Sequence, residues 1–487
     1  MATPIPANRC AFSLGEAAAA LGAVLRSPDP ARRATSVSID TRTLAPGAIF
    51  VALRGVADGH AFLARAAERG AAAAIVEHGR AFAGLDCLEV ADPLEALGRL
   101  AHAHLERVRA ARRLQVISIG GAAGKTTTKE LTATAARAII GPTLATPGNL
   151  NNLIGVPMTI FTLTAEHRAA VLECGTNTRG EIARLGAIVA PDAAMVLNAA
   201  LEHSEGLGTL EEIAAEEAAM FAAARRCAIL PAGDAILSRW LPEHLRAITF
   251  GPESGADLRV ADRTPLTAGS GARITLALNP ALIAAGANPI LTFETRLLGP
   301  AAALNCAAAL AAVAALSPAP ITTAQLEAVG ALFAAAAPIA RRMAPLELGG
   351  ALILDDSYNA QPPSMRVAIA TAHEVAAARA ARLIVVLGDM LELGALAPAA
   401  HDETVRQALD AGAAIFIAVG PEMSAALERA VRGVNARCHT VAAPESHAAA
   451  EMVRGLVRPG DVVLVKGSLG MAMDRVIDLL RANLPHH

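Results

Sequence analysis

The stretch from Val116 to Lys129 reads VISIGGAAGKTTTK, and it constrains the fold more than any other part of the chain. Its apolar first half predicts a buried strand, its glycines predict a tight turn, and Lys125 and Thr126 begin a helix. Such a turn directs several backbone N–H groups and the positive end of a helix dipole at one point, which favours an anion. The predicted phosphate-binding loop consists of Gly121, Ala122, Ala123, Gly124, Lys125, Thr126 and Thr127.

Within this loop, Lys125 is placed to reach the β- and γ-phosphates of a nucleotide, and the Thr126 hydroxyl is placed to bind Mg²⁺. The glycine spacing is irregular, because Ile119 stands where the full phosphate-loop pattern has glycine. The alternative is a strand–turn–helix connection that carries a surface lysine. Lysine occurs only at positions 125, 129 and 466, so each of the three lysines is a candidate for a specific role.

The length of 487 residues is too great for one core and suggests about three domains. We predict an α/β protein with domains at 1–112, 113–338 and 339–487. The central domain should be of the P-loop ATPase type, with a mostly parallel sheet and an antiparallel extension between about 225 and 297. Strands alternate with helices after 339, which predicts a Rossmann-like sheet, but no GxGxxG motif supports dinucleotide binding.

Composition excludes several classes of partner. A net charge of -3 and a charged content of 18% argue against nucleic acid as a main partner. Six scattered cysteines without a CxxC pair, and no secretory signal in residues 1–25, predict a cytoplasmic protein. The apolar segment 301–316 contains Asn305 and is shorter than the ~20 residues of a membrane span, so it predicts a core helix and no stable membrane insertion. The predicted oligomeric state is a monomer.

Polar residues follow the predicted parallel strands of the central domain. Glu173 follows an apolar strand at 169–172, and Asn198 follows a second at 193–197. Ligands bind at the carboxyl ends of strands in open α/β sheets, so we expect Glu173 to approach the Mg²⁺ held by Thr126. A lone histidine is usually structural, but the position of His203 in the following polar loop favours a metal or phosphate contact.

Three further polar segments are candidate binding sites. Asn149 and Asn152 lie in a loop rich in asparagine, glycine and proline, and their amides would serve a ligand or only the loop backbone. The turn that holds Ser38, Asp40, Thr41 and Arg42 would bind a diphosphate or sugar, or would be plain turn chemistry. In the third domain, strand ends at 355–359, 388–392 and 466–468 are expected to face the crevice of the phosphate loop.

The order of these motifs resembles that of the Mur ligases, and among them the MurF type, across essentially the whole chain. The motifs that carry the resemblance are Ser38–Arg42, Asp58–His60, the loop 121–127, Gly148–Asn152 with Gly155–Pro157, Gly180–Ile182, Asp355–Ala360, Gly388–Met390 with Glu392–Gly394, and Lys466–Ser468. The resemblance implies a UDP-sugar domain, a central ATPase domain, and a carboxy-terminal domain that binds a dipeptide and closes over ATP. The implied reaction joins D-alanyl-D-alanine to UDP-N-acetylmuramoyl-tripeptide through an acyl phosphate, with ATP and Mg²⁺, and gives UDP-MurNAc-pentapeptide, ADP and phosphate.

The resemblance also implies roles for single residues. Lys125, Glu173 and His203 would be catalytic, and Thr126, Glu173 and His203 would hold metal. The residues implied at the nucleotide are Asn305 on the adenine side, and Arg342 and Asp356 from the third domain. The residues assigned to the UDP-sugar are Ser38, Asp40, Thr41, Arg42, Asn149 and Asn152. The residues assigned to the dipeptide side are Tyr358, Asn359, Lys466 and Ser468.

Glu217 is the largest departure from the family pattern. It aligns with the lysine that Mur ligases carbamylate to make a carboxylate for a second magnesium ion. We expect Glu217 to supply that negative oxygen itself, directly or through water. The alternative is an exposed helix glutamate beside Glu216. For the whole chain, the rival interpretations are a Mur-like ligase with another acceptor and a degenerate paralogue that binds nucleotide without catalysis.

Overall fold

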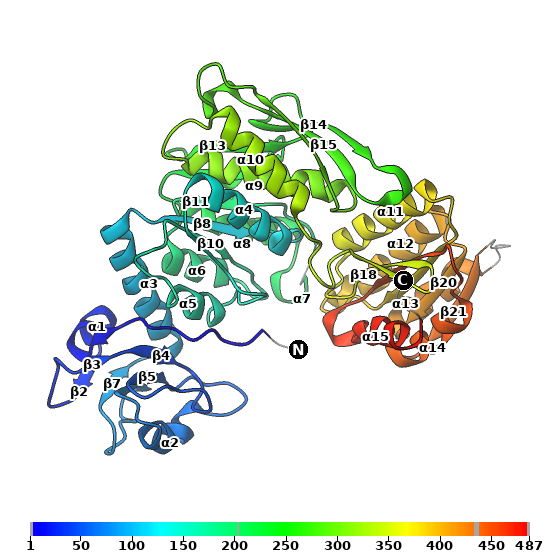
Figure 1. The fold of residues 1–487 in the computed structure, drawn as a ribbon. Coiled ribbons are helices and arrows are strands. Elements are labelled where there is room, and N and C mark those ends of the chain that lie inside the picture. The colour runs from blue at the N-terminus through cyan, green and yellow to red at the C-terminus, as the bar shows by residue number, and fades with distance from the viewer. Residues whose placement is uncertain (1–2, 202–203, 433–437, 485–487) are drawn as a thin grey trace.

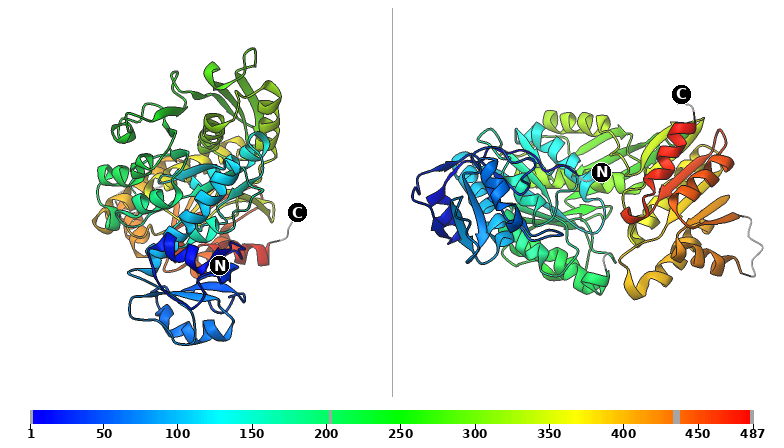
Figure 2. Two further views of the ribbon diagram at one scale, coloured as in Figure 1. Left: turned by 90° about the vertical axis from the view of Figure 1, so that its left-hand side faces the viewer. Right: turned by 90° about the horizontal axis from the view of Figure 1, so that it is seen from below.

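Three β-sheets organise the chain in the computed structural model, which describes residues 3–201, 204–432 and 438–484. They contain five, nine and six strands in chain order, and the nine-stranded sheet lies between the other two (Figures 1 and 2). The predicted α/β class with three domains is confirmed. His203 lies outside the described residues.

The first sheet has the strand order β2-β7-β6-β5-β4, with β2 antiparallel to an otherwise parallel set. Its parallel strands are short and wholly or mostly buried, as expected for strands covered on both faces. A two-stranded ribbon of β1 and β3 lies beside it. The bounds are β1 Phe12–Ser13, α1 Leu14–Leu21, β2 Val24–Arg26, β3 Arg33–Ala34, β4 Ser36–Ser38, β5 Ala48–Val51, η1 Gly59–Phe62, α2 Leu63–Glu68, β6 Ala73–Glu77, β7 Cys87–Val90 and α3 Pro93–Arg112.

The central sheet has the order β16-β15-β14-β13-β12-β11-β8-β10-β9. Strand β8 is flanked by β10 and β11, both parallel to it, so its end lies where the strand order reverses. The first elements are β8 Gln115–Gly120, α4 Lys125–Ile139, β9 Thr143–Ala145, α5 Gly155–Ile160, β10 Ala169–Glu173, α6 Glu181–Val189, β11 Ala193–Val196, α7 Ser204–Leu207 and α8 Leu210–Ala222. Thus the carboxyl ends of β8, β10 and β11 meet at one edge.

The outer half of the central sheet is less antiparallel than the sequence suggested. Strands β12 and β13 continue the parallel pairing, and only β14, β15 and β16 pair antiparallel. The elements are β12 Cys227–Pro231, η2 Leu237–Trp240, β13 Arg246–Gly251, β14 Leu258–Pro265, η3 Thr267–Gly269, β15 Ala272–Leu278, η4 Pro280–Leu282, β16 Ile290–Thr295, α9 Pro300–Leu316 and α10 Thr323–Ala335. The hairpin of β14 and β15 reaches the third domain (Figure 1), where Arg263 forms two hydrogen bonds of 2.7 and 2.6 Å with Glu374.

Helix α9 confirms the core helix predicted over 301–316. Its alanines and leucines are mostly buried, and it packs against α4 and β13. Such dense contact fits a helix whose small side chains let neighbouring elements approach closely. Within residues 3–201, 204–432 and 438–484, none of the helices has the length and apolar character of a membrane span.

The third sheet has the order β17-β18-β22-β19-β20-β21 and is parallel except for β17. This is the Rossmann-like arrangement that the sequence predicted. Its elements are β17 Ala344–Leu348, β18 Ala351–Asp356, α11 Pro362–Ala378, β19 Leu383–Gly388, η5 Gly394–Leu396, α12 Ala397–Asp410, β20 Ile415–Val419, α13 Pro421–Val431, β21 His439–Ala443, α14 Ser446–Leu456, β22 Val462–Lys466, η6 Leu469–Met471 and α15 Asp474–Asn483.

Helix α3 connects the first sheet to the central one and carries a buried histidine, His104. Its Nε2 donates to the Leu163 carbonyl at 3.0 Å, and its Nδ1 accepts from Arg107 at 3.0 Å. Burial lowers the pKa of His104 to about 4; the hydrogen bond to the Leu163 carbonyl opposes this shift, and the charge of Arg107 adds to it. The ring is therefore neutral in the folded protein near neutral pH.

We expect His104 to make the folded state sensitive to acid. The unfolded chain, with a histidine pKa of about 6.5, binds more protons than the folded chain as pH falls toward 4, which lowers the free energy of unfolding by roughly 3 kcal/mol. Urea unfolding midpoints at about pH 7.5 and about pH 5 should therefore differ less in His104→Leu than in the parent protein. The exposed His244 provides the control variant His244→Leu. An equal midpoint difference in His104→Leu and the parent would contradict this prediction.

Candidate active site

The predicted phosphate-binding loop, residues 121–127, begins directly after β8 and runs into α4, and we call it the cradle. Its backbone has the shape that phosphate binding needs. Gly121 has a φ of 113°, and a Cβ there would lie 2.9 Å from the Leu197 backbone nitrogen. Gly124 has a φ of 88°, and a Cβ there would lie 2.9 Å from Oδ1 of Asn305. Both positions require glycine, since a side chain would be strained and crowded. Helix α4 then begins at Lys125, so its first N–H groups point toward the end of the sheet.

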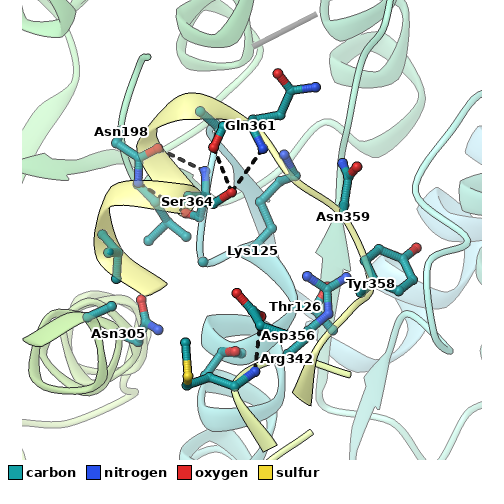
Figure 3. A pocket seen from close by; sticks show the side chains of 18 of the residues that line it. Lys125, Thr126, Asn198, Asn305, Arg342, Asp356, Tyr358, Asn359, Gln361 and Ser364 are labelled. Carbon is teal, nitrogen blue, oxygen red and sulfur yellow. Dashed lines mark hydrogen bonds between the residues drawn. The ribbon is translucent and has the colours of Figure 1, made fainter. Parts of the chain in front are cut away.

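Asn198 holds the tip of this loop from the end of β11 (Figure 3). Its Oδ1 accepts the Ala123 N–H at 2.9 Å, and its Nδ2 donates to the Ala123 carbonyl at 3.0 Å. Its own carbonyl accepts the Ala122 N–H at 3.1 Å. The Lys125 ammonium hydrogen-bonds back to the Gly121 carbonyl. The loop is therefore held in shape by backbone contacts, which alanine at 122 and 123 supplies as well as a polar residue.

Glu173 lies beside Thr126, as the strand-end argument predicted. The Thr126 hydroxyl donates to Oε2 of Glu173 at 3.0 Å, and Asn151 Nδ2 donates to Oε1 at 3.0 Å. Glu173 is only 1% exposed. Hydroxyl and carboxylate oxygens are the hard donors that Mg²⁺ prefers, so this pair fits the ion that the family implies.

Glu216 and Glu217 on α8 are both buried, so the interpretation as an exposed helix face is wrong. Glu216 accepts the N–H groups of Gly180 and Ile182 at 2.7 and 2.8 Å, which caps α6. Glu217 turns to the cradle, where Oε2 accepts the Gly121 N–H at 2.7 Å. Burial raises the pKa of Glu217, while the charge of Lys125 opposes this rise.

The second carboxylate oxygen of Glu217 is a buried polar atom without a hydrogen-bond partner in the described part of the chain. A buried acceptor of this kind is costly unless a cation, a donor or a proton meets it. Within the described ranges, no three His, Cys, Asp or Glu side chains gather as a ready-made metal cluster. Glu217 thus has one carboxylate oxygen that a cation, a donor or a proton could meet.

A cavity of about 940 Å³ lies between the central and third domains, with the cradle in one wall. The central-domain residues that line it include Lys125, Thr126, Asn149, Asn152, Glu173 and Asn305. The third-domain side contributes Arg342, Asp356, Tyr358, Asn359, Lys466 and Ser468. Figure 3 shows Arg342, Asp356 and Tyr358 on the side opposite Asn198 and Asn305. The tertiary structure therefore joins the predicted nucleotide residues and the predicted dipeptide residues in one space.

The third-domain residues are ordered by contacts with one another. Lys466 is 3% exposed, and its Nζ donates to Oδ2 of Asp356 at 2.6 Å and to the Asn359 carbonyl at 2.7 Å. The guanidinium of Arg342 lies 4.1 Å from the ring centre of Tyr358, within the range of a cation–π contact. Lys466 therefore fixes the Asp356 carboxylate at the wall of the cavity.

Some residues that were predicted to bind a ligand instead form hydrogen bonds within their own turns. Asp40 accepts hydrogen bonds from the backbone and guanidinium of Arg42, and these contacts lower the pKa of Asp40. Ser38, Thr41 and their neighbours in this turn do not line the described cavity. Asn152 lines the cavity, but its Oδ1 accepts the Ile154 and Gly155 N–H groups at 3.1 and 2.8 Å. The contacts of Asp40 and Asn152 are therefore those of ordinary turns, which was the alternative to ligand binding at both positions.

Four residues of the site were given no specific role by the sequence argument: Lys129, Asn151, Asn198 and Glu216. Asn198 stood at a strand end, and Asn151 stood between two asparagines that were singled out, so a signal existed for both. Lys129 could have been noticed because lysine occurs at only three positions in the chain. Glu216 carried none, since adjacent acidic residues on a helix are ordinary on a surface.

Comparison with known proteins gives consistent matches. The family model of the Mur ligase middle domain matches residues 119–313, and that of the Mur ligase, glutamate ligase domain matches residues 341–469. The UDP-N-acetylmuramoyl-tripeptide–D-alanyl-D-alanine ligase of Escherichia coli (strain K12) is 34% identical over 456 residues, which covers 92% of this chain and 94% of the relative. The ligase of the same name from Treponema pallidum (strain Nichols) is 31% identical and covers 95% of this chain and 97% of the relative.

Solved structures agree with these relatives. A crystal structure of MurF from Acinetobacter baumannii superposes with a TM-score of 0.84 at 28% identity, and covers 97% of this chain and 100% of that chain. MurF of Thermotoga maritima in complex with ADP shares the fold, with a TM-score of 0.77 at 23% identity over 92% of this chain and 97% of that chain. The resemblance inferred from the motifs is confirmed: the chain belongs to the Mur ligase family.

Proposed function

We propose that the chain joins D-alanyl-D-alanine to UDP-N-acetylmuramoyl-tripeptide and couples this amide bond to ATP cleavage. The products are UDP-MurNAc-pentapeptide, ADP and phosphate. The observation that carries the proposal is the shared cavity, which has a phosphate cradle in one domain and ordered polar residues of a second domain opposite it. The names of relatives that match over nearly the whole chain support the choice of substrates.

ATP would lie with its phosphates at the start of α4. Helix N-terminal N–H groups bind phosphate oxygens, and the Lys125 ammonium would neutralise charge on the transferring phosphoryl group. Asn305 in the same wall would contact the adenine side, and Arg342 and Asp356 would reach the nucleotide from the third domain. Thr126 and Glu173 would hold Mg²⁺, which when bound supplies further neutralisation of phosphate charge.

The reaction has two steps in this proposal. An oxygen of the tripeptide's terminal carboxylate attacks the γ-phosphorus, so an oxygen–phosphorus bond forms, the bond between the γ-phosphorus and the β–γ bridging oxygen breaks, and ADP leaves. The dipeptide amine then attacks the acyl carbon, the carbon–oxygen bond breaks, and phosphate leaves as the amine loses its proton. Residues of both domains line the space, and closure of the third domain would align the reactants and exclude water from the acyl phosphate.

The domain assignment belongs to the same proposal. Residues 1–112 would bind the UDP-sugar, residues 113–338 would bind ATP, and residues 339–487 would bind the dipeptide and close over ATP. Tyr358, Asn359, Lys466 and Ser468 would face the dipeptide. The metal role of His203, the cytoplasmic location and the monomeric state remain predictions.

Glu217 would serve a second magnesium ion without carbamylation. Its position next to Gly121 puts a carboxylate at the base of the cradle, and its unpaired oxygen leaves an acceptor for a cation or a bound water. A glutamate needs no CO₂ to carry its charge.

The first prediction concerns the reaction itself. Phosphate release from ATP should require both UDP-N-acetylmuramoyl-tripeptide and D-alanyl-D-alanine, since the first supplies the attacking carboxylate and the second removes the acyl phosphate. A coupled phosphate assay with each substrate omitted in turn measures this. Turnover with single amino acids but not with the dipeptide would indicate another acceptor. No phosphate release with both substrates would indicate a degenerate nucleotide-binding protein.

The second prediction concerns Lys125. Lys125→Met should lower kcat by roughly 10²–10³, as is typical when a group that stabilises transition-state charge is lost. The KM for D-alanyl-D-alanine should change little, because the dipeptide side belongs to the third domain. Arg273→Met, which removes an exposed cation on β15, is the matched control and should retain full kcat. Equal activity of the two variants would exclude the role of Lys125.

The third prediction concerns Glu217. The parent protein should turn over without added bicarbonate, and Glu217→Ala should lose activity and need more magnesium. Glu217→Lys should regain activity only when bicarbonate is supplied, because a lysine must be carbamylated to become an anion. Glu217→Ala with full turnover and unchanged magnesium dependence would refute the assignment, as would a bicarbonate requirement of the parent.

A further inference from the structure

Lys129 is a buried cation beside the site that the mechanism above does not use. The chain contains 42 lysine and arginine residues, yet lysine stands only at 125, 129 and 466. Lys125 and Lys466 both line the cavity. Lys129 follows Lys125 by one turn of α4. Because arginine supplies every other cation, the three lysines mark positions at which the compact ammonium has a purpose of its own.

The Lys129 side chain is 0% exposed and ends among oxygen atoms. Its Nζ donates to the carbonyls of Thr146 and Gly148 at 2.7 and 3.1 Å. It also lies 3.1 Å from Oε1 of Glu130 and 3.8 Å from Oε2 of Glu173. An ammonium directs three donors from one small centre, whereas a planar guanidinium carries five donors that the same space would not satisfy.

The two carbonyls that Lys129 holds belong to the loop 146–152, which also orients Glu173. The Thr146 hydroxyl accepts the Glu173 N–H at 2.9 Å, and Asn151 donates to Oε1 of Glu173 at 3.0 Å. The other oxygen of Glu173 accepts from Thr126. One buried cation therefore contacts both the start of the loop and the carboxylate that the loop surrounds.

We propose that Lys129 is a positioning residue, which fixes the 146–152 loop and through it the Glu173 carboxylate for the magnesium ion of the bound nucleotide. This inference rests on the proposed function, because that function assigns Glu173 to the metal. If Lys129 only joined a helix to a loop, its loss would lower stability and leave the magnesium dependence unchanged.

Magnesium titrations of nucleotide binding test this role without turnover. Binding of a non-hydrolysable ATP analogue is measured against Mg²⁺ concentration for the parent, Lys129→Met, Lys129→Arg and Glu130→Gln. Lys129→Met should raise the magnesium concentration at half-maximal binding by about 10-fold, a typical effect of losing a partner that orients a metal ligand. Lys129→Arg should not restore the parent value. Glu130→Gln removes the charge of the half-exposed neighbour, keeps both carbonyl contacts, and should match the parent.

Steady-state kinetics provide a second readout. The KM for D-alanyl-D-alanine should stay unchanged in Lys129→Met, while the magnesium requirement of turnover rises with that of binding. Lower thermal stability with parental magnesium dependence would overturn the proposal, and so would full restoration by Lys129→Arg. If Lys129→Met does not fold, Lys129→Gln replaces it. The glutamine amide nitrogen ends one bond short of the Lys129 ammonium and carries no charge, so it does not reproduce the contacts with both carbonyls and Glu173, and the same rise is expected. Failure of the proposed function is distinct, because the parent would then bind magnesium and nucleotide but not ligate.

Discussion

The hydrogen bonds of the backbone N–H groups after β8 determine how the rest of the site is arranged. The chain turns sharply at Gly121, where the strand ends and no ladder partner remains. A buried N–H without an acceptor costs about 1–3 kcal/mol, so each group needs a partner. Glu217 accepts the first N–H, and Asn198 accepts the next two from the end of β11. Hydrogen bonds with Asn198, which follows β11, and with Glu217 on α8 therefore connect these elements to the cradle, in addition to apolar packing.

Buried charged side chains, like the buried N–H groups of the cradle, are paired on both sides of the cavity. In the central domain the buried ammonium of Lys129 approaches the Glu173 carboxylate, and in the third domain the buried ammonium of Lys466 bonds to Asp356. The carboxylate of each pair stands at the carboxyl end of a parallel strand, Glu173 on β10 and Asp356 on β18. A buried charge is stable only with partners, so the two pairs hold two carboxylates at fixed places in facing walls.

Contacts away from the cavity connect the two domains that form it. Arg263 on β14 bonds to Glu374 on α11, and Ser204 on α7 donates to the Leu393 carbonyl at 3.1 Å. These contacts join opposite flanks of the central domain to the third domain, with the cradle between them (Figure 1). The geometry suits a ligase, which must gather three substrates and keep water from an activated acid.

The sequence by itself determined the features that depend on neighbours along the chain. The strand, glycines and helix start of the cradle are local, and Glu173 could be placed because strand ends share one edge of a parallel sheet. The α/β class and the core helix over 301–316 followed from the length and polarity of apolar runs. Tertiary structure decided which polar residues are buried. In the sequence, Glu216 and Glu217 look like an exposed helix face, and only the packing of α8 against α6 and β8 buries them. The hydrogen-bond partners of Lys129 lie in the 146–152 loop, which follows β9. Burial and partner choice depend on contacts between segments distant in sequence, so spacing alone did not reveal them.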